Sequence, residues 1–461
     1  MSNTGPLIDL VSRGKQDTNL ITNDNKESLF YNKGNKKHTN FSRGSVTVDY
    51  KGNGNWGSTI KFLIPKTGDL LSSIYLNVKL PEISVDDIIG ISESDKENYR
   101  IKWIDYIGNG LIDKVSLKIG GQTIEELYGI YMQIHTDLYD DDWNKLMMLG
   151  HDGKLNSPQK ILYADELYIP LKFSFSNGPR QSLPILALQY HDIEVEVKFT
   201  DFHSCYSVLK ELPDESLVHT NKKIRTKQFD KIVLDTNVMY LSSEERKEIA
   251  MKDHKILITQ VQRRQVNVKN DSSIDLNLNH PVKELMFFIQ PIKNIKQGEL
   301  FNFSPKLRYL SNEYENINGY DLKEYKKMPK YHLLESARIL FNGIERVEWK
   351  NYKYYYYLQN YENYRKSADH YFYLYAFSIC PKSNEPAGSC NFSRIDNAQL
   401  QFKFKKVPET PLEITDSNNN ISEIHVNGSI DNDNEGIFTL YATNYNYLII
   451  KGGMGGLEFN N

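Results

Sequence analysis

YIPLKFSFSNGPRQSLPILALQYHDIEVEVKF at Tyr168–Phe199 and YLYAFSICPKSNEPAGSCNFSRIDNAQLQFKF at Tyr373–Phe404 are the two stretches that decide the fold. They have equal length and align without a gap. Each starts with an apolar strand-like run, continues through a loop containing Gly and Pro, and ends in an alternating run that closes on Lys-Phe. Strict alternation is typical of half-buried β-strands. The pair therefore predicts a β unit that occurs twice in the chain.

A second pair of segments repeats in the same order. IDKVSLKIGGQTIEE begins at Ile112, and LESARILFNGIERVE begins at Leu334. Both are typical of a strand, a two-residue turn and a second strand. Gly120-Gly121 and Asn342-Gly343 stand at the turns, where residues that tolerate positive φ are needed. Two matches at similar offsets favour tandem β domains over a chance similarity.

The rest of the chain favours short strands joined by long connections. In SSIYLNVKL at Ser72–Leu80, the apolar residues alternate along the run. The predicted helices are short: Ser242–Ala250, with Ser242 and Glu245 as a capping box, and Tyr128–Met148, ending at Gly150. This many strands in each copy favours a sandwich or jelly roll over a single open sheet. We therefore predict an all-β protein with short helices in its loops.

The predicted domain boundaries follow from the repeats. Residues 1–26 are polar and are expected to form an extended N-terminal arm. Residues 27–210 form the first β domain, and the polar residues 211–227 form a linker. Residues 228–461 form the second domain, whose first strand is expected in KIVLDTNVMYL at Lys231–Leu241.

Composition excludes several classes of protein. The 461 residues carry a net charge of −3 and no basic arm, which argues against direct coating of nucleic acid. Three cysteines, Cys205, Cys380 and Cys390, are an odd number without metal-ligand spacing, so a reducing compartment is expected. No secretory signal is visible at the N-terminus, and the apolar runs are too short to cross a bilayer.

Two motifs resemble ligand sites but lack an essential part. GNGNWG at Gly52–Gly57 has the glycine spacing of a dinucleotide loop, but STIKFLIP follows it, and this segment is typical of a strand instead of the required helix. DNDNEG at Asp431–Gly436 resembles the start of a calcium loop, but Ala442 stands where the twelfth-position glutamate would be. We interpret both as surface loops.

The histidines and cysteines do not form a convincing catalytic pattern. His191 and Asp192 are adjacent, and adjacent residues on a strand point to opposite faces, so a structural histidine is expected. Cys390 has no activating histidine nearby in the sequence, so a packed residue is expected. KYYYYLQNYENY at Lys353–Tyr364 could stack bases or sugars, but we favour a tyrosine-rich strand and loop that cover a barrel surface or a subunit interface.

The stretch PAGSCNFSRIDNAQL at Pro386–Leu400 combines Cys390 with a glycosylation sequon at Asn391. We interpret it as scaffold, with a silent sequon. Arg394 and Asp396 are two residues apart and would share a strand face, which suggests a structural ion pair.

Several stretches together resemble one protein family. They include IPKTGDLLSSIYLNVKLP from Ile64, IGNGLIDKVSLKIGGQTIEELYG from Ile107, LNHPVKELMFFIQ from Leu278, and the terminal YATNYNYLIIKGGMGGLEF. In this order and spacing, the chain resembles the double jelly-roll major capsid proteins of nucleocytoplasmic large DNA viruses, nearly from end to end. It departs from the usual family pattern at Pro65–Asp69 and in the tyrosine-rich stretch after Trp349.

The resemblance implies a non-enzymatic structural protein with two tandem eight-stranded jelly rolls. Three chains would form a pseudo-hexagonal capsomer that tiles an icosahedral shell around an inner membrane and a DNA genome. Its partners would be other copies of itself, minor capsid and penton proteins, and the inner membrane through the N-terminal arm. Nucleic acid would not be contacted directly. The virion would be its location, after assembly in the host cytoplasm, and no catalytic, cofactor-binding or metal-binding residue is expected.

An alternative class is a carbohydrate-binding or glycoside-cleaving jelly-roll protein. It would use the tyrosines as sugar platforms and a pair of carboxylates for hydrolysis. The capsid hypothesis instead predicts large, mostly apolar and aromatic contacts between copies of the chain. Mass in solution and glycosidase activity distinguish the two hypotheses.

Overall fold

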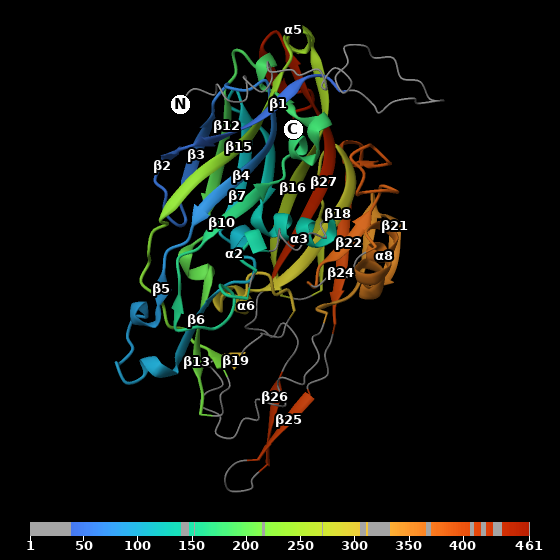
Figure 1. The fold of residues 1–461 in the computed structure, drawn as a ribbon. Helices are drawn as coiled ribbons and strands as arrows, with labels where there is room; N and C mark the ends of the chain where they lie inside the picture. The colour runs from blue at the N-terminus through green and yellow to red at the C-terminus, as the bar shows by residue number, and fades with distance from the viewer. Residues whose placement is uncertain are drawn as a thin grey trace, which may run out of the picture.

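Two β-sandwiches stand side by side, and each is built from two facing sheets (Figure 1). The computed structural model describes residues 38–139, 147–151, 153–213, 217–269, 271–304, 310–311, 332–365, 370–405, 410–415, 421–426 and 436–460. The predicted arm, residues 1–26, lies outside the described residues. The all-β prediction with tandem jelly rolls is confirmed.

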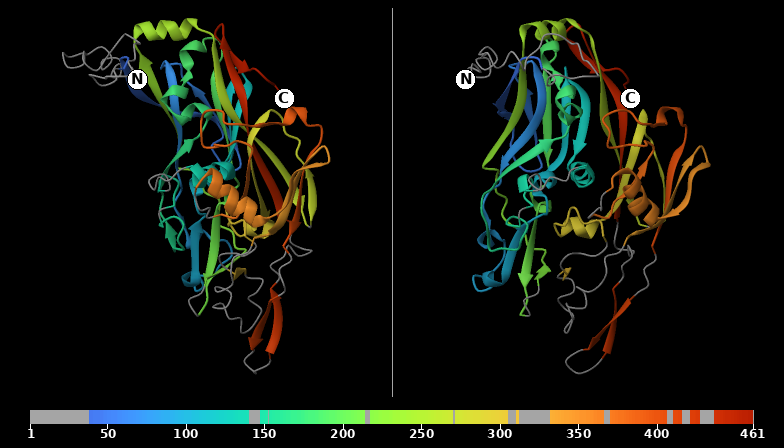
Figure 2. Two further views of the ribbon diagram at one scale, coloured as in Figure 1. Left: turned by 90° about the vertical axis from the view of Figure 1, so that its right-hand side faces the viewer. Right: turned by 45° about the vertical axis from the view of Figure 1, so that its right-hand side comes forward.

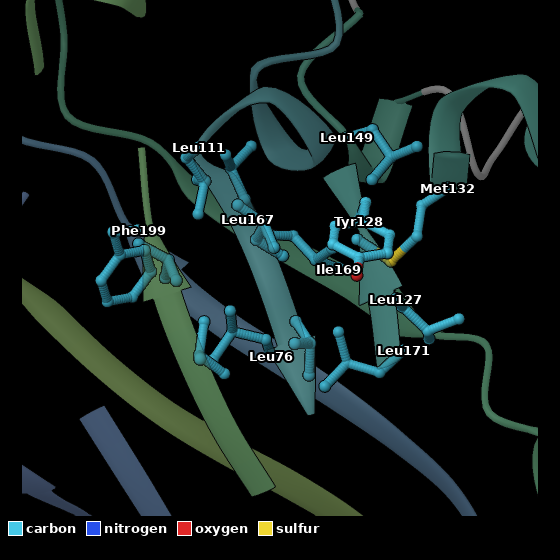
Figure 3. Close-up of a cluster of buried hydrophobic side chains, with 14 of the residues drawn as sticks. Leu76, Leu111, Leu127, Tyr128, Met132, Leu149, Leu167, Ile169, Leu171 and Phe199 are labelled. Atoms are coloured by element: carbon cyan, nitrogen blue, oxygen red, sulfur yellow. The ribbon is translucent and has the colours of Figure 1, made fainter. Parts of the chain in front are cut away.

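The first jelly roll consists of two facing sheets. One sheet has the order β1 (Phe41–Val48), β15 (Lys231–Leu241), β4 (Leu70–Lys79), β10 (Glu166–Leu171), with β11 (Leu183–Pro184) also paired to β4. The other has the order β2 (Tyr50–Gly52), β3 (Thr59–Ile64), β12 (Ile193–Phe199), β7 (Ile112–Ile119), β8 (Gln122–Tyr128). Between them lies a core of buried apolar side chains, and Figure 3 shows the part of it around Leu76, Leu167 and Ile169.

The second jelly roll repeats this arrangement. One sheet has the order β16 (His254–Val268), β27 (Gly436–Lys451), β18 (Pro281–Pro291), β22 (Tyr373–Ala376), with β23 (Cys390–Asn391) and β28 (Met454–Leu457) paired to it. The other has the order β17 (Ser272–Asp275), β24 (Ala398–Phe404), β20 (Leu334–Phe341), β21 (Ile344–Asn351). The two strand orders correspond apart from β2, which has no counterpart in the second, so β15 in the first jelly roll has the place of β27 in the second.

This correspondence corrects the predicted position of one strand. Lys231–Leu241, expected to open the second domain, is β15 and pairs with β1 and β4 of the first. The predicted linker at 211–227 is also partly structured, because β14 (Leu217–His219) pairs with β13 (Tyr206–Glu211). Polar composition indicated a linker, but a polar strand at the end of a sandwich has the same composition.

Both predicted hairpins are confirmed. Gly120 and Gly121 have φ of 56° and 82°, and Asn342 and Gly343 have φ of 51° and 79°. This left-handed backbone is the conformation that a two-residue hairpin turn requires. Tyr168 and Tyr373 are aligned as the first residues of the long repeat, but Tyr168 is 40% exposed and Tyr373 is 1% exposed. Because aligned residues should have similar burial, the gapless alignment does not hold in the first strand.

The helices are short, as predicted, with different details. α5 (Ser243–Met251) begins after Ser242, but Ser242 makes no side-chain capping bond, so the predicted capping box is wrong. α3 begins at Gly129 and is described to Tyr139. The other α-helices that the structure describes are α2 (Ile107–Gly110), α6 (Ile292–Lys296) and α8 (Gln359–Asn363).

Long insertions gather at one end of the molecule. This end carries three small sheets, formed by β5 (Ile83–Ser84) with β9 (Ile161–Leu162), by β6 (Tyr99–Trp103) with β13, β14 and β19 (Leu310–Ser311), and by β25 (Thr410–Thr415) with β26 (Ile421–Val426). Figure 1 and Figure 2 show α5 and the C-terminus at the opposite end. The molecule is therefore elongated, with different surfaces at its two ends.

Candidate functional site

The candidate functional site is the contact between the two jelly rolls, where one apolar cluster contains residues of both. β18 contains the run LMFFIQ and is buried on both faces. Leu285 and Phe287 enter the core of the second jelly roll, whereas Met286 and Phe288 join the core that continues into the first. A strand buried on both faces has a continuous apolar run instead of alternation. We call the surface shared by the two jelly rolls the seam.

Aromatic side chains form much of the seam. Tyr441 of β27 stacks on Tyr128 of β8, with ring centroids 5.7 Å apart, and meets the edge of Tyr131 of α3 at 5.6 Å. Arg263 of β16 lies over the Tyr128 ring, 4.2 Å from its centroid. Large rings add buried apolar area to such a contact, and a cation over an aromatic face favours one relative orientation of the two surfaces.

Polar groups fix the register of the two jelly rolls. The Ser174 hydroxyl donates to the carbonyl of Thr259 at 3.0 Å, and the Thr259 amide donates to the Ser174 hydroxyl oxygen at 2.9 Å. The Ser174 amide donates to Glu125 Oε2 at 2.9 Å. Burial raises the pKa of Glu125 to about 7, because the charged carboxylate has lost its water.

A second buried carboxyl lies in the middle of the seam. Glu284 of β18 accepts a hydrogen bond from Tyr139 of α3 at 3.0 Å and another from Tyr364, and the Lys283 ammonium lies 3.6 Å from it. Burial raises the pKa of Glu284, and Lys283 opposes this effect. The carboxyl thus joins both jelly rolls and the segment after α8.

A third polar contact joins the jelly rolls near the insertions. His219 Nε2 of β14 lies 2.7 Å from Glu299 Oε1, and both side chains are buried. Burial alone would raise the pKa of Glu299, but the hydrogen bond and charge of His219 outweigh it and lower the pKa. The predicted linker region therefore contributes directly to the seam.

Sequence reasoning missed these groups. Glu125 and Glu284 each stand beside apolar residues in a strand, and this was the available signal. The groups that donate hydrogen bonds to them, on Ser174, Tyr139 and Tyr364, are distant in the sequence, so spacing could not identify them.

The predicted ligand motifs have structural positions. Gly52–Gly57 connects β2 to β3, and Trp56 within it stacks on Phe229 at 4.2 Å. The expected surface loop is therefore seen, without a helix to receive a phosphate. Asp431–Gly436 lies outside the described residues except for Gly436, where β27 begins.

His191 has a partner other than Asp192. Its Nδ1 lies 3.0 Å from the Gly455 carbonyl oxygen in β28, so it connects the first jelly roll to the end of the chain. Asp192 instead lies 3.3 Å from the Lys66 ammonium. The two adjacent side chains therefore do not act as a base and its orienting acid.

The scaffold interpretation of Pro386–Leu400 holds with one correction. Burial raises the pKa of the Cys390 thiol, the opposite of what a nucleophile needs. Arg394 belongs to a 3₁₀ turn, Phe392–Arg394, so the argument from a shared strand face does not apply. Arg394 and Asp396 are both exposed, and no ion pair between them is found among the described residues.

The tyrosine-rich stretch is helical, so the predicted strand and loop are wrong. A π-helical turn, Tyr354–Leu358, continues into α8. Tyr355 points inward and donates to the Ala337 carbonyl at 3.0 Å. Alternation cannot be recognised in a run of identical tyrosines, and Tyr is common in strands, so the sequence favoured the wrong element.

Other ligand chemistry has little support in the described part of the chain. No group of three or more His, Cys, Asp or Glu side chains there could hold a metal ion. None of its helices is long and apolar enough to cross a membrane. The outer face of β1, β15 and β4 has a hollow of about 530 Å³ whose lining includes Arg43, Tyr75 and Asn237 but no carboxylate. A glycosidase pair is therefore absent from this hollow.

Comparison with known proteins gives the same fold along nearly the whole chain. The model for the major capsid protein N-terminus matches residues 28–242, and the model for the large eukaryotic DNA virus major capsid protein matches residues 245–456. In the solved PBCV-1 virus capsid, the matching chain is 23% identical, with a TM-score of 0.72 over 94% of this chain and 100% of that one. The Faustovirus major capsid protein is 13% identical, with a TM-score of 0.66 over 92% and 93%.

Curated relatives agree with the structural likeness. The major capsid protein of Paramecium bursaria Chlorella virus 1 is 28% identical and that of Phaeocystis pouchetii virus is 25% identical, and each match covers 99% of this chain and 100% of the relative. These relatives are structural proteins, not enzymes. With both family models matching in sequence order and the double jelly-roll fold in place, the chain belongs to the family of major capsid proteins of large eukaryotic DNA viruses.

Proposed function

We propose that three copies of this chain close into a pseudo-hexagonal capsomer, and that capsomers tile an icosahedral shell. The observation that carries the proposal is the seam. It is a head-to-tail contact, in which the sheet containing β18 in the second jelly roll faces β8 and α3 of the first. Among the described residues of one chain, nothing covers the corresponding surfaces at the two outer sides of the molecule in this way. Repeating this contact between chains would close a ring of six jelly rolls.

The surfaces left open are more polar than the seam. On the outer face of the first jelly roll, Thr47 donates to Asp235 at 2.7 Å. On the outer face of the second, Trp349 lies between Arg338 and Lys403, 4.9 Å and 4.6 Å from its ring centroid. We therefore propose polar contacts between chains with a few aromatic anchors, which differs from the mostly apolar contacts expected from the sequence.

The two ends of the molecule support an orientation in the shell. The insertions at the β6 and β13 end would face outward, and the α5 end would face the inner membrane, minor capsid proteins and penton proteins. The arm at residues 1–26 would extend from this inner side. A net charge of −3 favours a shell separated from the DNA genome by the membrane. We place assembly in the host cytoplasm, where reduced cysteines fit the conditions.

Mass and shape in solution test this function. The expected species is a trimer of the 53.6 kDa chain, which light scattering or native mass spectrometry would detect. Electron microscopy should show six-cornered particles and, at high concentration, hexagonal sheets. A chain that stays monomeric at micromolar concentration would contradict the proposal, and glycosidase activity would favour the carbohydrate alternative.

A further inference from the structure

The tyrosine-rich helix, which we define as residues Tyr354–Asn363, has a fixed inner side and an open outer side. Tyr355 is anchored to the Ala337 carbonyl, and Tyr364 just after the helix binds Glu284. On the outer side, Tyr357, Leu358 and Tyr361 are 57%, 43% and 75% exposed. Three neighbouring large side chains on one helix face form an apolar patch that nothing in the described chain covers.

α3 has the corresponding place in the first jelly roll. It follows the β7–β8 hairpin and precedes β10, just as the tyrosine-rich helix follows the β20–β21 hairpin and precedes β22. Figure 1 shows α3 and α8 at the same level of the molecule. The outer face of α3 is covered, because α3 docks on the second jelly roll. Tyr131 Oη lies 3.5 Å from Thr443 Oγ1, and Tyr139 donates to Glu284.

Matching β-bulges show which residues of the first jelly roll correspond to this docking surface. In the second, pairing skips Lys283, so that Val282 faces Asn444 and Glu284 faces Thr443. In the first, pairing skips one residue in the same way, so that Leu71 faces Val238 and Ser73 faces Asn237. Ser73 and Asn237 therefore correspond to Glu284 and Thr443, the two residues that bind α3.

Ser73 and Asn237 line the hollow of about 530 Å³ on the outer face of β1, β15 and β4. The second jelly roll has its corresponding surface filled by tyrosines of α3, whereas the first has an open hollow there. The serines leave room for large side chains, and hydroxyl and amide groups suit the polar tip of a tyrosine. Arg43 also lines the hollow, and its guanidinium can stack on an aromatic ring, as that of Arg263 does on Tyr128 from a different strand position.

We propose that the tyrosine-rich helix of one chain docks into this hollow on a second copy, with Tyr357 and Tyr361 as its anchors. The contact repeats between chains the docking of α3 within one chain. It deepens the proposed function and rests on it, because it names the surfaces that would close the trimer.

Paired cysteines test the contact in the full chain. In a Cys380→Ser background, Tyr361→Cys is combined with Arg43→Cys, two exposed positions that belong to different jelly rolls. Mild oxidation should link neighbouring chains, giving covalent dimers and trimers on a non-reducing gel. The matched control replaces Arg43→Cys by Tyr190→Cys, which is 75% exposed on the same jelly roll and outside the hollow. It should give no linked species.

Two further variants measure the energy of the contact. Tyr357→Ala with Tyr361→Ala should raise the concentration at which trimers dissociate by about tenfold or more, because buried tyrosines often dominate an interface. Ser73→Tyr, which fills the hollow from within, should have a similar effect without changing the circular dichroism of the folded chain. Tyr163→Ala is the control, because Tyr163 is similarly exposed and does not line the hollow.

The outcomes separate this inference from the proposed function. Trimers that form without the Tyr361–Arg43 link, or that tolerate both tyrosine substitutions, would overturn the docking contact and leave the capsomer in place. An unmodified chain that forms no trimer would overturn the capsomer and the contact together.

Discussion

Glu125 is a carboxyl that the fold removes from water at the seam. It has a pKa of about 7 because of burial, although the Ser174 amide donates to it. In the unfolded chain its pKa would return to an ordinary value near 4.5. The folded state therefore binds a proton that the unfolded state releases between these two pH values.

This difference predicts a pH-dependent effect of Glu125→Gln. The protonated carboxyl stabilises the fold fully below pH 4.5, and this contribution is lost as pH rises through about 7. At pH 8 the neutral amide should therefore raise the free energy of unfolding, by at most about 3.5 kcal/mol. At pH 4.5 the difference should be small. Thermal melts of both chains at the two pH values measure it, and an equal shift at both would contradict the burial argument.

Single residues also show where sequence reasoning stops. Glu284 stands in the apolar run VKELMFFIQ, a signal that the sequence analysis did not use, and its partners Tyr139 and Tyr364 come from other elements. Whether a buried carboxyl stabilises the fold depends on which hydrogen-bond donors the fold brings to it. No pattern within one segment contains that information.

At the scale of elements, β15 decides where the first jelly roll ends. It lies between β1 and β4 and pairs with both. We propose a boundary at Ser242, just before α5, instead of the boundary expected at 228. If the chain were cut before β15, β1 and β4 would each have an unpaired edge where the middle of the sheet should be.

Two fragments test this boundary. A chain of residues 28–242 should fold, with the β-sheet circular dichroism of a sandwich and a cooperative thermal transition. A chain of residues 28–227 lacks the strand between β1 and β4, so it should aggregate or melt without cooperativity. Equal stability of both fragments would show that β15 is dispensable and that the boundary lies before it.

Local chemistry explains which elements the sequence could predict. The hairpins at Gly120-Gly121 and Asn342-Gly343 were predictable because the turn itself demands residues with positive φ. The tyrosine-rich helix was not, because its conformation depends on Tyr355 reaching Ala337 on a distant strand. Burial against another element can override intrinsic preference in such a segment.

At the scale of the whole molecule, the core of the first jelly roll continues across the seam to β18 and β27, and the second jelly roll also has a core of its own. Tyr441 of β27 packs on rings of the first jelly roll, whereas Phe438 of the same strand stacks on Phe402 within the second, 5.2 Å away. Two aromatic residues on opposite faces of one strand thus contribute to different contacts. A shared core of this kind couples the unfolding of both halves.

Tyr441→Ala and Phe438→Ala together test whether the seam couples the unfolding of the two jelly rolls, because both lower stability but only one weakens the seam. Each removes a buried ring and should cost about 3–5 kcal/mol. Phe438→Ala weakens one jelly roll but keeps the seam, so calorimetry should show a single transition at a lower temperature. Tyr441→Ala weakens the seam, so the transition should broaden or divide in two, because each jelly roll keeps its own sheets. If Tyr441→Ala also melts in one equally sharp transition, Tyr441 does not carry the coupling. If Phe438→Ala melts in two transitions, the seam does not couple the halves, and the head-to-tail contact would be too weak to serve as the pattern for contacts between chains.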